Sequence, residues 1–163
     1  MNTCGTTSSK YPFLWGYFNS CSQESKIKER LREQEWGYLQ CPEDFAKICC
    51  ERREYGTFYY RIPGGEAGSD VYDRVNDLLG SLYRDFAEDD FPEHCVLITH
   101  GLTIKLFVMR FFHLTVEDFE QMKAPKNCDL VILELQKDGH YCLTTEMEQN
   151  TEPLRYSRPI NIL

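Results

Sequence analysis

The residues of this 163-residue chain best suited to chemistry are Thr99-His100-Gly101-Leu102-Thr103. The apolar run 95–99 predicts a buried strand before His100, and the apolar residues from 102 onward predict a helix after it. In open α/β sheets, ligands bind at the carboxyl ends of strands, and helix N-termini favour anions. His100 and the backbone of Gly101, which allows a ligand to approach closely, are therefore candidate phosphate-binding groups. A histidine that only caps the end of the strand fits this position equally well.

A second candidate is the pair of carboxylates, Glu33 and Glu35, in the stretch LREQEWG at 31–37. In an extended segment, side chains two residues apart lie on the same face. A carboxyl group in a partly apolar site can donate a proton to a leaving group. From these residues alone, an ordinary charged surface is the favoured interpretation.

A third candidate is the glycine-rich stretch 60–70, YRIPGGEAGSD, which leads into a predicted helix N-terminus. Such a turn suits a phosphate group, but the stretch does not have the Walker pattern. A structural turn and helix cap is therefore the favoured interpretation. Arg61 adds local positive charge here, whereas Arg52 and Arg53 are expected on a solvated face.

Three stretches, in this order and at these spacings, resemble the histidine phosphatase (phosphoglycerate-mutase-like) superfamily: LREQEWG, PGGEAGSDVYDRV and CVLITHGLTIKLFVMRFF. The likeness is greatest to its plant and fungal phosphoglycerate-mutase-like phosphatases and covers about residues 29–146. It implies an α/β fold, a three-layer sandwich with a mixed, mainly parallel sheet, in which the N-terminal strand region is incomplete. It also implies hydrolysis of phosphate monoesters through a phosphohistidine, without cofactor or metal.

The resemblance implies roles for individual residues. His100 matches the family's second active-site histidine, which binds the transferring phosphoryl group. Glu33 matches the acidic residue of the L-x-E motif, the proposed general acid. Glu66 matches the acidic residue of a Gly-Glu-Ser turn, in which Ala67 replaces the serine. A supporting or structural role is expected for Glu66 and Arg61.

The chain departs from the family pattern because it contains neither Arg-His-Gly, whose histidine accepts the phosphoryl group, nor Ser-Pro-x-x-Arg. Phosphoryl transfer needs an in-line nucleophile and positive groups around the phosphoryl oxygens. Activity is therefore expected to be impaired or absent in this form. Three explanations stay open: a truncated product, a relative that binds phosphorylated ligands or partners without turnover, or another nucleophile such as a cysteine.

The remaining pattern predicts the elements that hold these residues. Helical spacing and capping predict helices over 42–54, 69–86 with Ser69 as N-cap, 102–112, and 116–122 with Thr115 as N-cap. Apolar runs predict buried strands at 95–99 and 130–135, the second in a hairpin with 141–145, and buried thiols at Cys95 and Cys128. Residues 22–35 fit a short helix or a loop into a strand. The aromatic run Tyr11–Phe18 is expected to pack over the gap left in the sheet.

Composition limits the domains and partners. We expect one domain with three parts: a divergent, partly disordered segment at 1–28, a partial histidine-phosphatase domain at 29–149 and a tail at 150–163. The net charge of −8 gives no support for nucleic-acid binding, and the chain has no apolar run of ~18 residues that would span a membrane. The expected ligand is phosphate or a phosphorylated small molecule. Eight cysteines without C-x-x-C spacing favour reduced thiols in a cytoplasmic protein, and open strand edges favour a homo-oligomer.

Overall fold

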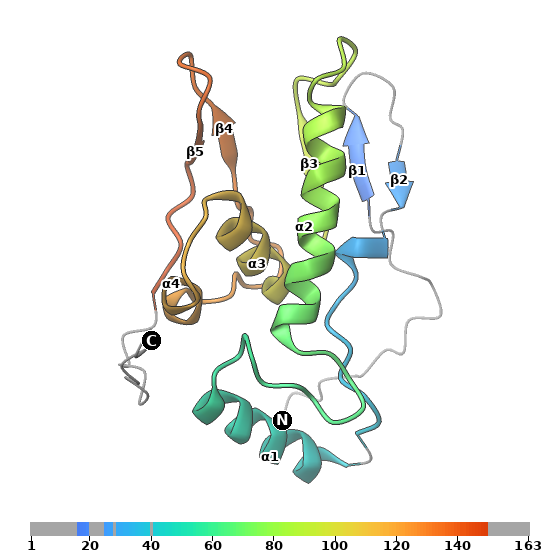
Figure 1. Ribbon diagram of the computed structural model, residues 1–163, viewed down its shortest axis with the longest axis vertical. Helices are drawn as coiled ribbons and strands as arrows, with labels where there is room; N and C mark the ends of the chain where they lie inside the picture. Colours follow the sequence, from blue (N-terminus) through green and yellow to red (C-terminus); the bar gives the residue numbers. More distant parts are fainter. Residues whose placement is uncertain (1–15, 20–24, 28, 40, 150–163) are drawn as a thin grey trace, which may run out of the picture.

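A computed structural model describes residues 16–19, 25–27, 29–39 and 41–149 (Figure 1). Most of the segment predicted at 1–28, including the first part of the aromatic run, and the tail at 150–163 lie outside these ranges. In chain order the elements are β1 (Gly16–Asn19), β2 (Ser25–Ile27), the 3₁₀ helix η1 (Glu29–Leu31), α1 (Pro42–Tyr55), α2 (Gly68–Asp85), β3 (Cys95–Leu97), α3 (Gly101–Phe111), α4 (Val116–Gln121), β4 (Leu133–Leu135) and β5 (Tyr141–Leu143). The four helices predicted from the sequence are all present within a residue or two of their expected bounds.

The long helix α2 supplies one side of the core, as its periodicity predicts. The residues at helical spacing along one face are at most 2% exposed: Val71, Val75, Leu78, Leu79 and Leu82. They pack with α3, whose Leu106 and Val108 are also buried. Burial of each such side chain stabilises the fold by roughly 2 kcal/mol. The packing of α2 against α3 therefore fixes the positions of the residues at the N-termini of the two helices.

The start of α2 differs from the prediction, because the N-cap is Ala67 and not Ser69. The side chain of Asp70, three residues on, accepts a hydrogen bond of 2.8 Å from the Ala67 N–H. Arg61 in turn lies 2.7 Å from the Asp70 carboxylate and lowers the pKa of that group. Here the carboxylate in the first turn caps the helix, so the serine is not needed as a cap.

The sheet differs from the expected one. Strand β1 pairs antiparallel with both β2 and β3, and β4 pairs antiparallel with β5. Every strand pairing in the described ranges is antiparallel, so the mainly parallel sheet is not found there. The three-layer sandwich stays a prediction. Residues 17 and 18 of the aromatic run pair with Leu97 and Val96, so this run does supply a neighbour for β3.

The two apolar runs predicted to be buried strands are only partly buried, and this prediction was wrong. Leu97 packs against the core, but Val96 and Ile98 are 48% and 45% exposed. Side chains alternate along a strand, so β3 buries one face and leaves the other open. The second run is still more exposed, with Leu130 at 73%. Cys128 is likewise exposed rather than buried.

The C-terminal part follows local sequence signals closely. The Thr115 hydroxyl accepts a hydrogen bond from the Asp118 N–H, and the Asp118 carboxylate accepts one from the Thr115 N–H, which caps α4 at its predicted start. Strands β4 and β5 form the predicted hairpin, with Gly139 in its turn at φ 84°. Among the described residues, no helix combines the length and the apolar character required to cross a bilayer.

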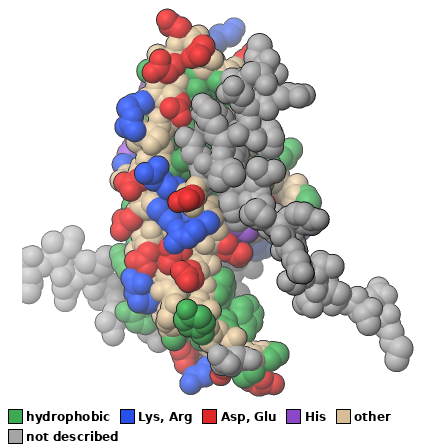
Figure 2. Space-filling view, turned by 90° about the vertical axis from the view of Figure 1, so that its right-hand side faces the viewer, with side chains coloured by type: hydrophobic (Ala, Val, Ile, Leu, Met, Phe, Trp, Pro, Cys, Tyr) green, Lys and Arg blue, Asp and Glu red, His purple; other side chains and the backbone are tan. Residues whose placement is uncertain are grey.

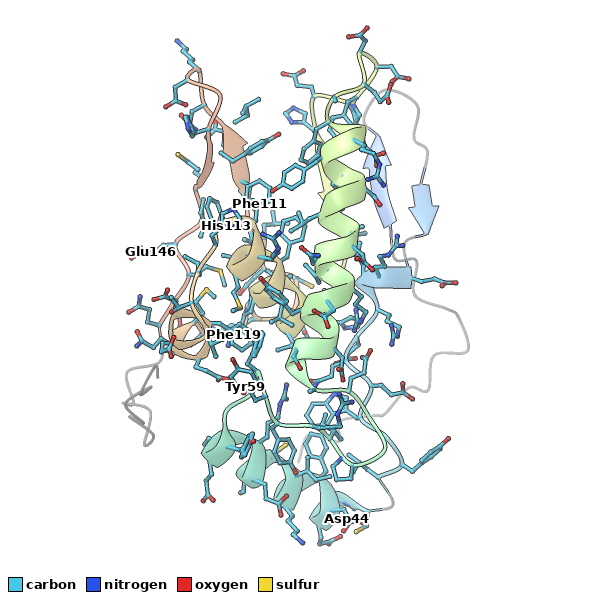
Figure 3. The ribbon with its side chains drawn as sticks, viewed as in Figure 1. Asp44, Tyr59, Phe111, His113, Phe119 and Glu146 are labelled. Atoms are coloured by element: carbon cyan, nitrogen blue, oxygen red, sulfur yellow. The ribbon has the colours of Figure 1, made fainter. Side chains whose placement is uncertain are left out.

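Helix α3 carries a buried basic residue, Lys105. Its side chain is 7% exposed, and its ammonium group lies 4.2 Å from the centre of the Phe119 ring. Figure 3 shows Phe119 where α4 meets the loop that carries Tyr59. Burial lowers the pKa of Lys105 to about 8, and the positive charge of Arg52 adds to this, while Glu120 opposes it. Protonated Lys105 is therefore less favourable in the folded protein than in the unfolded chain, which lowers the free energy of unfolding.

Replacing Lys105 with methionine is expected to stabilise the protein by roughly 1–3 kcal/mol at pH 7. The pKa of the amine is lower in the folded state, so the unfolded chain binds more protons between about pH 8 and its ordinary value of 10.5. Wild-type stability should thus rise with pH across that window, and the advantage of Lys105→Met should shrink there. Urea unfolding at several pH values measures the stability of the wild type and of Lys105→Met. Lys47→Met, at an exposed lysine, is the control. Destabilisation by Lys105→Met at pH 7 would contradict this.

Candidate functional site

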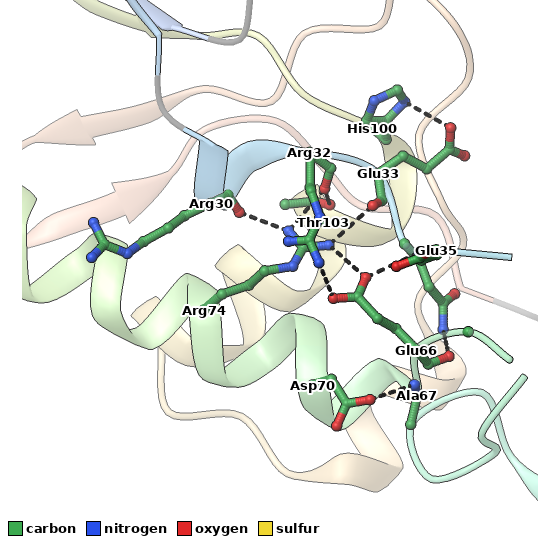
Figure 4. Close-up of polar contacts among 12 residues, drawn as sticks. Arg30, Arg32, Glu33, Glu35, Glu66, Ala67, Asp70, Arg74, His100 and Thr103 are labelled. Atoms are coloured by element: carbon green, nitrogen blue, oxygen red, sulfur yellow. Dashed lines mark hydrogen bonds and ion pairs between the residues drawn. The ribbon is translucent and has the colours of Figure 1, made fainter. Parts of the chain in front are cut away.

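The structure brings the two predicted catalytic residues together. His100 is the N-cap residue of α3, directly after the segment that continues β3. Glu33 lies in the irregular stretch after η1, and its Oε2 atom is 3.5 Å from Nδ1 of His100 (Figure 4). The imidazole is 28% exposed and the carboxylate is 57% exposed. A partly covered histidine and a carboxylate open to solvent thus meet at a helix N-terminus.

The surroundings of His100 favour its neutral form. Burial lowers the pKa of the imidazole, Glu33 opposes this, and the positive charge of Arg74 adds to the lowering. The first N–H groups of an α-helix have no partner within the helix and carry partial positive charge. An anion at this N-terminus would therefore meet favourable charge and would draw a proton onto His100.

The backbone that carries Glu33 is held by side chains of α2 and of the residues around His100. The Arg74 guanidinium donates to the carbonyls of Arg30 and Arg32 at 2.7 and 2.8 Å, and to that of Glu33 at 3.2 Å. The Thr99 hydroxyl donates to the Leu31 carbonyl, and the Thr103 hydroxyl to that of residue 32. Figure 4 shows Arg74 reaching from α2 across to this stretch.

Glu66 is the acceptor at the centre of this network. Its carboxylate accepts from Arg32 at 2.5 Å, from Arg74 at 3.2 Å and from the N–H of Glu35 at 3.0 Å. Its own N–H donates to the Glu35 carbonyl, and its carbonyl accepts from the side chain of Gln34. The side chain of Glu66 is 13% exposed. Glu66 thus joins the turn before α2 to the stretch that carries Glu33.

Two glycines allow these segments to touch. A Cβ atom on Gly65 would lie 2.3 Å from the Glu35 carbonyl oxygen, and one on Gly37 would lie 2.3 Å from the Pro63 carbonyl oxygen. Gly37 also has φ of 65°, which disfavours other residues. The glycine-rich turn at 63–65 is therefore packed against backbone. This contact explains the glycines without any ligand.

Two further arginines, Arg61 and Arg52, have structural partners. Arg61 pairs with Asp70 and donates to the Gly65 carbonyl, so it ties the turn to the start of α2. Arg52 was expected on a solvated face, and this prediction was wrong. Its guanidinium donates to the side chain of Gln34 at 2.6 Å and lies 5.1 Å from the Trp36 ring centre, and burial lowers its pKa. Figure 2 shows basic and acidic side chains interspersed over one face of the molecule.

Gly101 has a packing role that the sequence did not indicate. A Cβ atom there would lie 3.3 Å from both the Ala124 side chain and the Pro125 carbonyl oxygen. The sequence reasoning also missed Arg74. Arg74 adjoins the buried Val75 on α2, and an arginine at the edge of a buried helix face is the signal that was available.

The arrangement matches a known class of protein. The family model of the histidine phosphatase superfamily (branch 1) matches residues 18–147, and the chain belongs to this family.

Within the family, the chain is 38% identical over 120 residues to phosphoglycerate mutase-like protein AT74 of Arabidopsis thaliana, which covers 70% of this chain and 38% of that protein. It is 33% identical over 138 residues to the broad-range acid phosphatase DET1 of Saccharomyces cerevisiae, which covers 81% of this chain and 41% of that protein. The chain thus spans about two-fifths of the length of these relatives.

A solved structure gives the same fold. The mycobacterial glucosyl-3-phosphoglycerate phosphatase, solved with inorganic phosphate, superposes with a TM-score of 0.57 at 23% identity. The match covers 74% of this chain and 63% of that one. At this identity the match supports the fold alone.

Proposed function

We propose that this chain binds the phosphoryl group of a phosphate monoester, or inorganic phosphate, at the N-terminus of α3. His100 and the backbone N–H of Gly101 are the proposed phosphate ligands, and Glu33 occupies the position that the family resemblance gives to the proton donor. The observation that carries the proposal is the 3.5 Å contact between Glu33 and His100 at a helix N-terminus. The acid phosphatase activity named for the yeast relative is consistent with it.

Two positive features of the site, the helix N-terminus and Arg74, favour an anionic ligand. A helix N-terminus stabilises a nearby negative charge by about 0.3–1 kcal/mol, and by up to ~2 kcal/mol where it is partly buried. Arg74 contributes positive charge from α2 close enough to affect His100. A dianionic phosphate would also shift His100 towards its protonated form and gain a charge-assisted hydrogen bond.

We further propose that these 163 residues do not hydrolyse phosphate monoesters through a phosphohistidine. They contain no Arg-His-Gly, and His100 is the only histidine followed by glycine. Loss of a nucleophile costs several powers of ten in rate, which one histidine and one glutamate do not restore. Binding without turnover is therefore the function assigned to this form of the chain.

Thermal unfolding with and without inorganic phosphate or vanadate tests the binding. A ligand at ten times its dissociation constant adds about 1.4 kcal/mol, or a few degrees in Tm for a protein of this size. This shift should disappear in His100→Ala and persist in His140→Ala, whose imidazole is 82% exposed. An unchanged wild-type Tm would overturn the binding proposal. Turnover of p-nitrophenyl phosphate that is lost in His100→Ala would overturn the proposal of binding without turnover.

A further inference from the structure

Four consecutive backbone carbonyls, from residues 30 to 33, accept hydrogen bonds from side chains. Arg74 donates to three of them, Thr99 to one, and Thr103 shares the carbonyl of Arg32. Buried backbone carbonyls are paired with other backbone groups, with side chains or with ordered water. Here side chains from α2 and from the β3–α3 junction fix the path of the backbone up to Glu33.

The donors are placed on both sides of His100. Thr99 precedes it directly, and Thr103 lies one turn into α3. Their hydroxyls therefore tie the segment that carries Glu33 to the segment that carries His100. Arg74 closes the arrangement from α2, with its side chain only 11% exposed and held by Glu66.

We infer that Arg74 is a positioning residue, which presents Glu33 to His100 by holding the backbone of residues 30–33. A guanidinium is planar and carries five N–H donors, so it can serve several acceptors in one fixed geometry. A lysine at this position keeps the charge but not the set of bonds. The role of Arg74 therefore depends on its shape as well as its charge.

The experiment measures how strongly Glu33 acts on His100. Among the described residues, Glu33 and Arg74 are charged groups that affect this imidazole, with opposite signs. NMR titration of the His100 ring is carried out in wild type, Glu33→Gln, Arg74→Lys and the double variant. In the wild-type background, Glu33→Gln should lower the proton affinity of His100 by about two- to fivefold, as expected for a partly exposed pair. In the Arg74→Lys background the same change should have little effect, because Glu33 is no longer held in place.

A matched control separates positioning from general stability. Arg110 on α3 donates to Asn76 on α2 at 2.6 Å, so it joins the same two helices through a side chain of α2 and not through the backbone of residues 30–33. Arg110→Lys should leave the effect of Glu33→Gln on His100 intact. An unchanged effect in Arg74→Lys, with only a lower Tm, would overturn the inference. This inference rests on the proposed function, which gives Glu33 its importance. The titration needs no phosphate, so it can succeed or fail independently of phosphate binding.

Discussion

Replacing Gly65 with alanine is expected to lower the free energy of unfolding by about 3 kcal/mol or more. The new Cβ atom would lie 2.3 Å from the Glu35 carbonyl oxygen and 2.9 Å from the Gly37 nitrogen. Both are backbone atoms, so no side chain can turn away to relieve the overlap. The turn before α2 would have to separate from residues 35–37, and the hydrogen bonds between Glu35 and Glu66 would be lost with it.

Gly80→Ala is the matched control for this prediction. Gly80 lies in the interior of α2, and a Cβ atom there would meet nothing within 4 Å. Alanine in a helix interior is more favourable than glycine by roughly 0.5–1 kcal/mol, so this variant should be stabilised. Urea unfolding measures the change in the free energy of unfolding for each of the two variants. A loss below about 1 kcal/mol for Gly65→Ala would mean that the two segments separate easily and do not position the site.

The parts of the fold that were predicted correctly depend on short-range patterns. The spacing of Val71, Val75 and Leu82 sets the buried face of α2 without reference to any other element. The capping pair of Thr115 and Asp118 likewise involves residues three apart. Such short-range patterns predict the helix and its cap whatever other elements pack around them.

The predictions that failed depend on what covers an element. The apolar residues Val96 and Leu130 indicate burial only if another layer lies over them, and a short strand does not itself show whether one does. Arg52 shows the converse case. Its charge suggests solvent, but the Trp36 ring and the Gln34 side chain provide partners that only the folded chain brings together.

The candidate site also contains residues that the sequence predicted and residues that it did not. Local patterns made His100 and Glu33 candidates, and the family resemblance added their roles and joined them in one site, because it carries information on residues far apart in the sequence. Arg74 was not singled out, because it donates mainly to backbone carbonyls and these leave no mark on side-chain identity. A residue that acts on the backbone of another segment is therefore the kind that sequence reasoning misses most readily.

Replacing Glu66 with alanine is expected to lower the free energy of unfolding by about 3 kcal/mol. The change removes the acceptor of two guanidinium groups and one backbone N–H. Arg74 would be left as a largely buried charge without its carboxylate, and loss of one partner from such a pair typically costs 3–5 kcal/mol. Arg32 contributes less, because its side chain is 45% exposed. Urea unfolding at neutral pH measures the loss.

Two further variants show where the loss comes from. Glu66→Gln keeps an oxygen that can accept from the Glu35 N–H, so it should cost less than the alanine variant. Glu51→Ala removes an exposed carboxylate that accepts from the Tyr60 hydroxyl, and it should cost no more than about 0.5 kcal/mol. If Glu66→Ala cost as little as Glu51→Ala, the backbone carbonyls alone would suffice to hold Arg74. The carboxylate would then be dispensable for the geometry of the site, and the positioning of Glu33 would depend on α2 and the threonines beside His100.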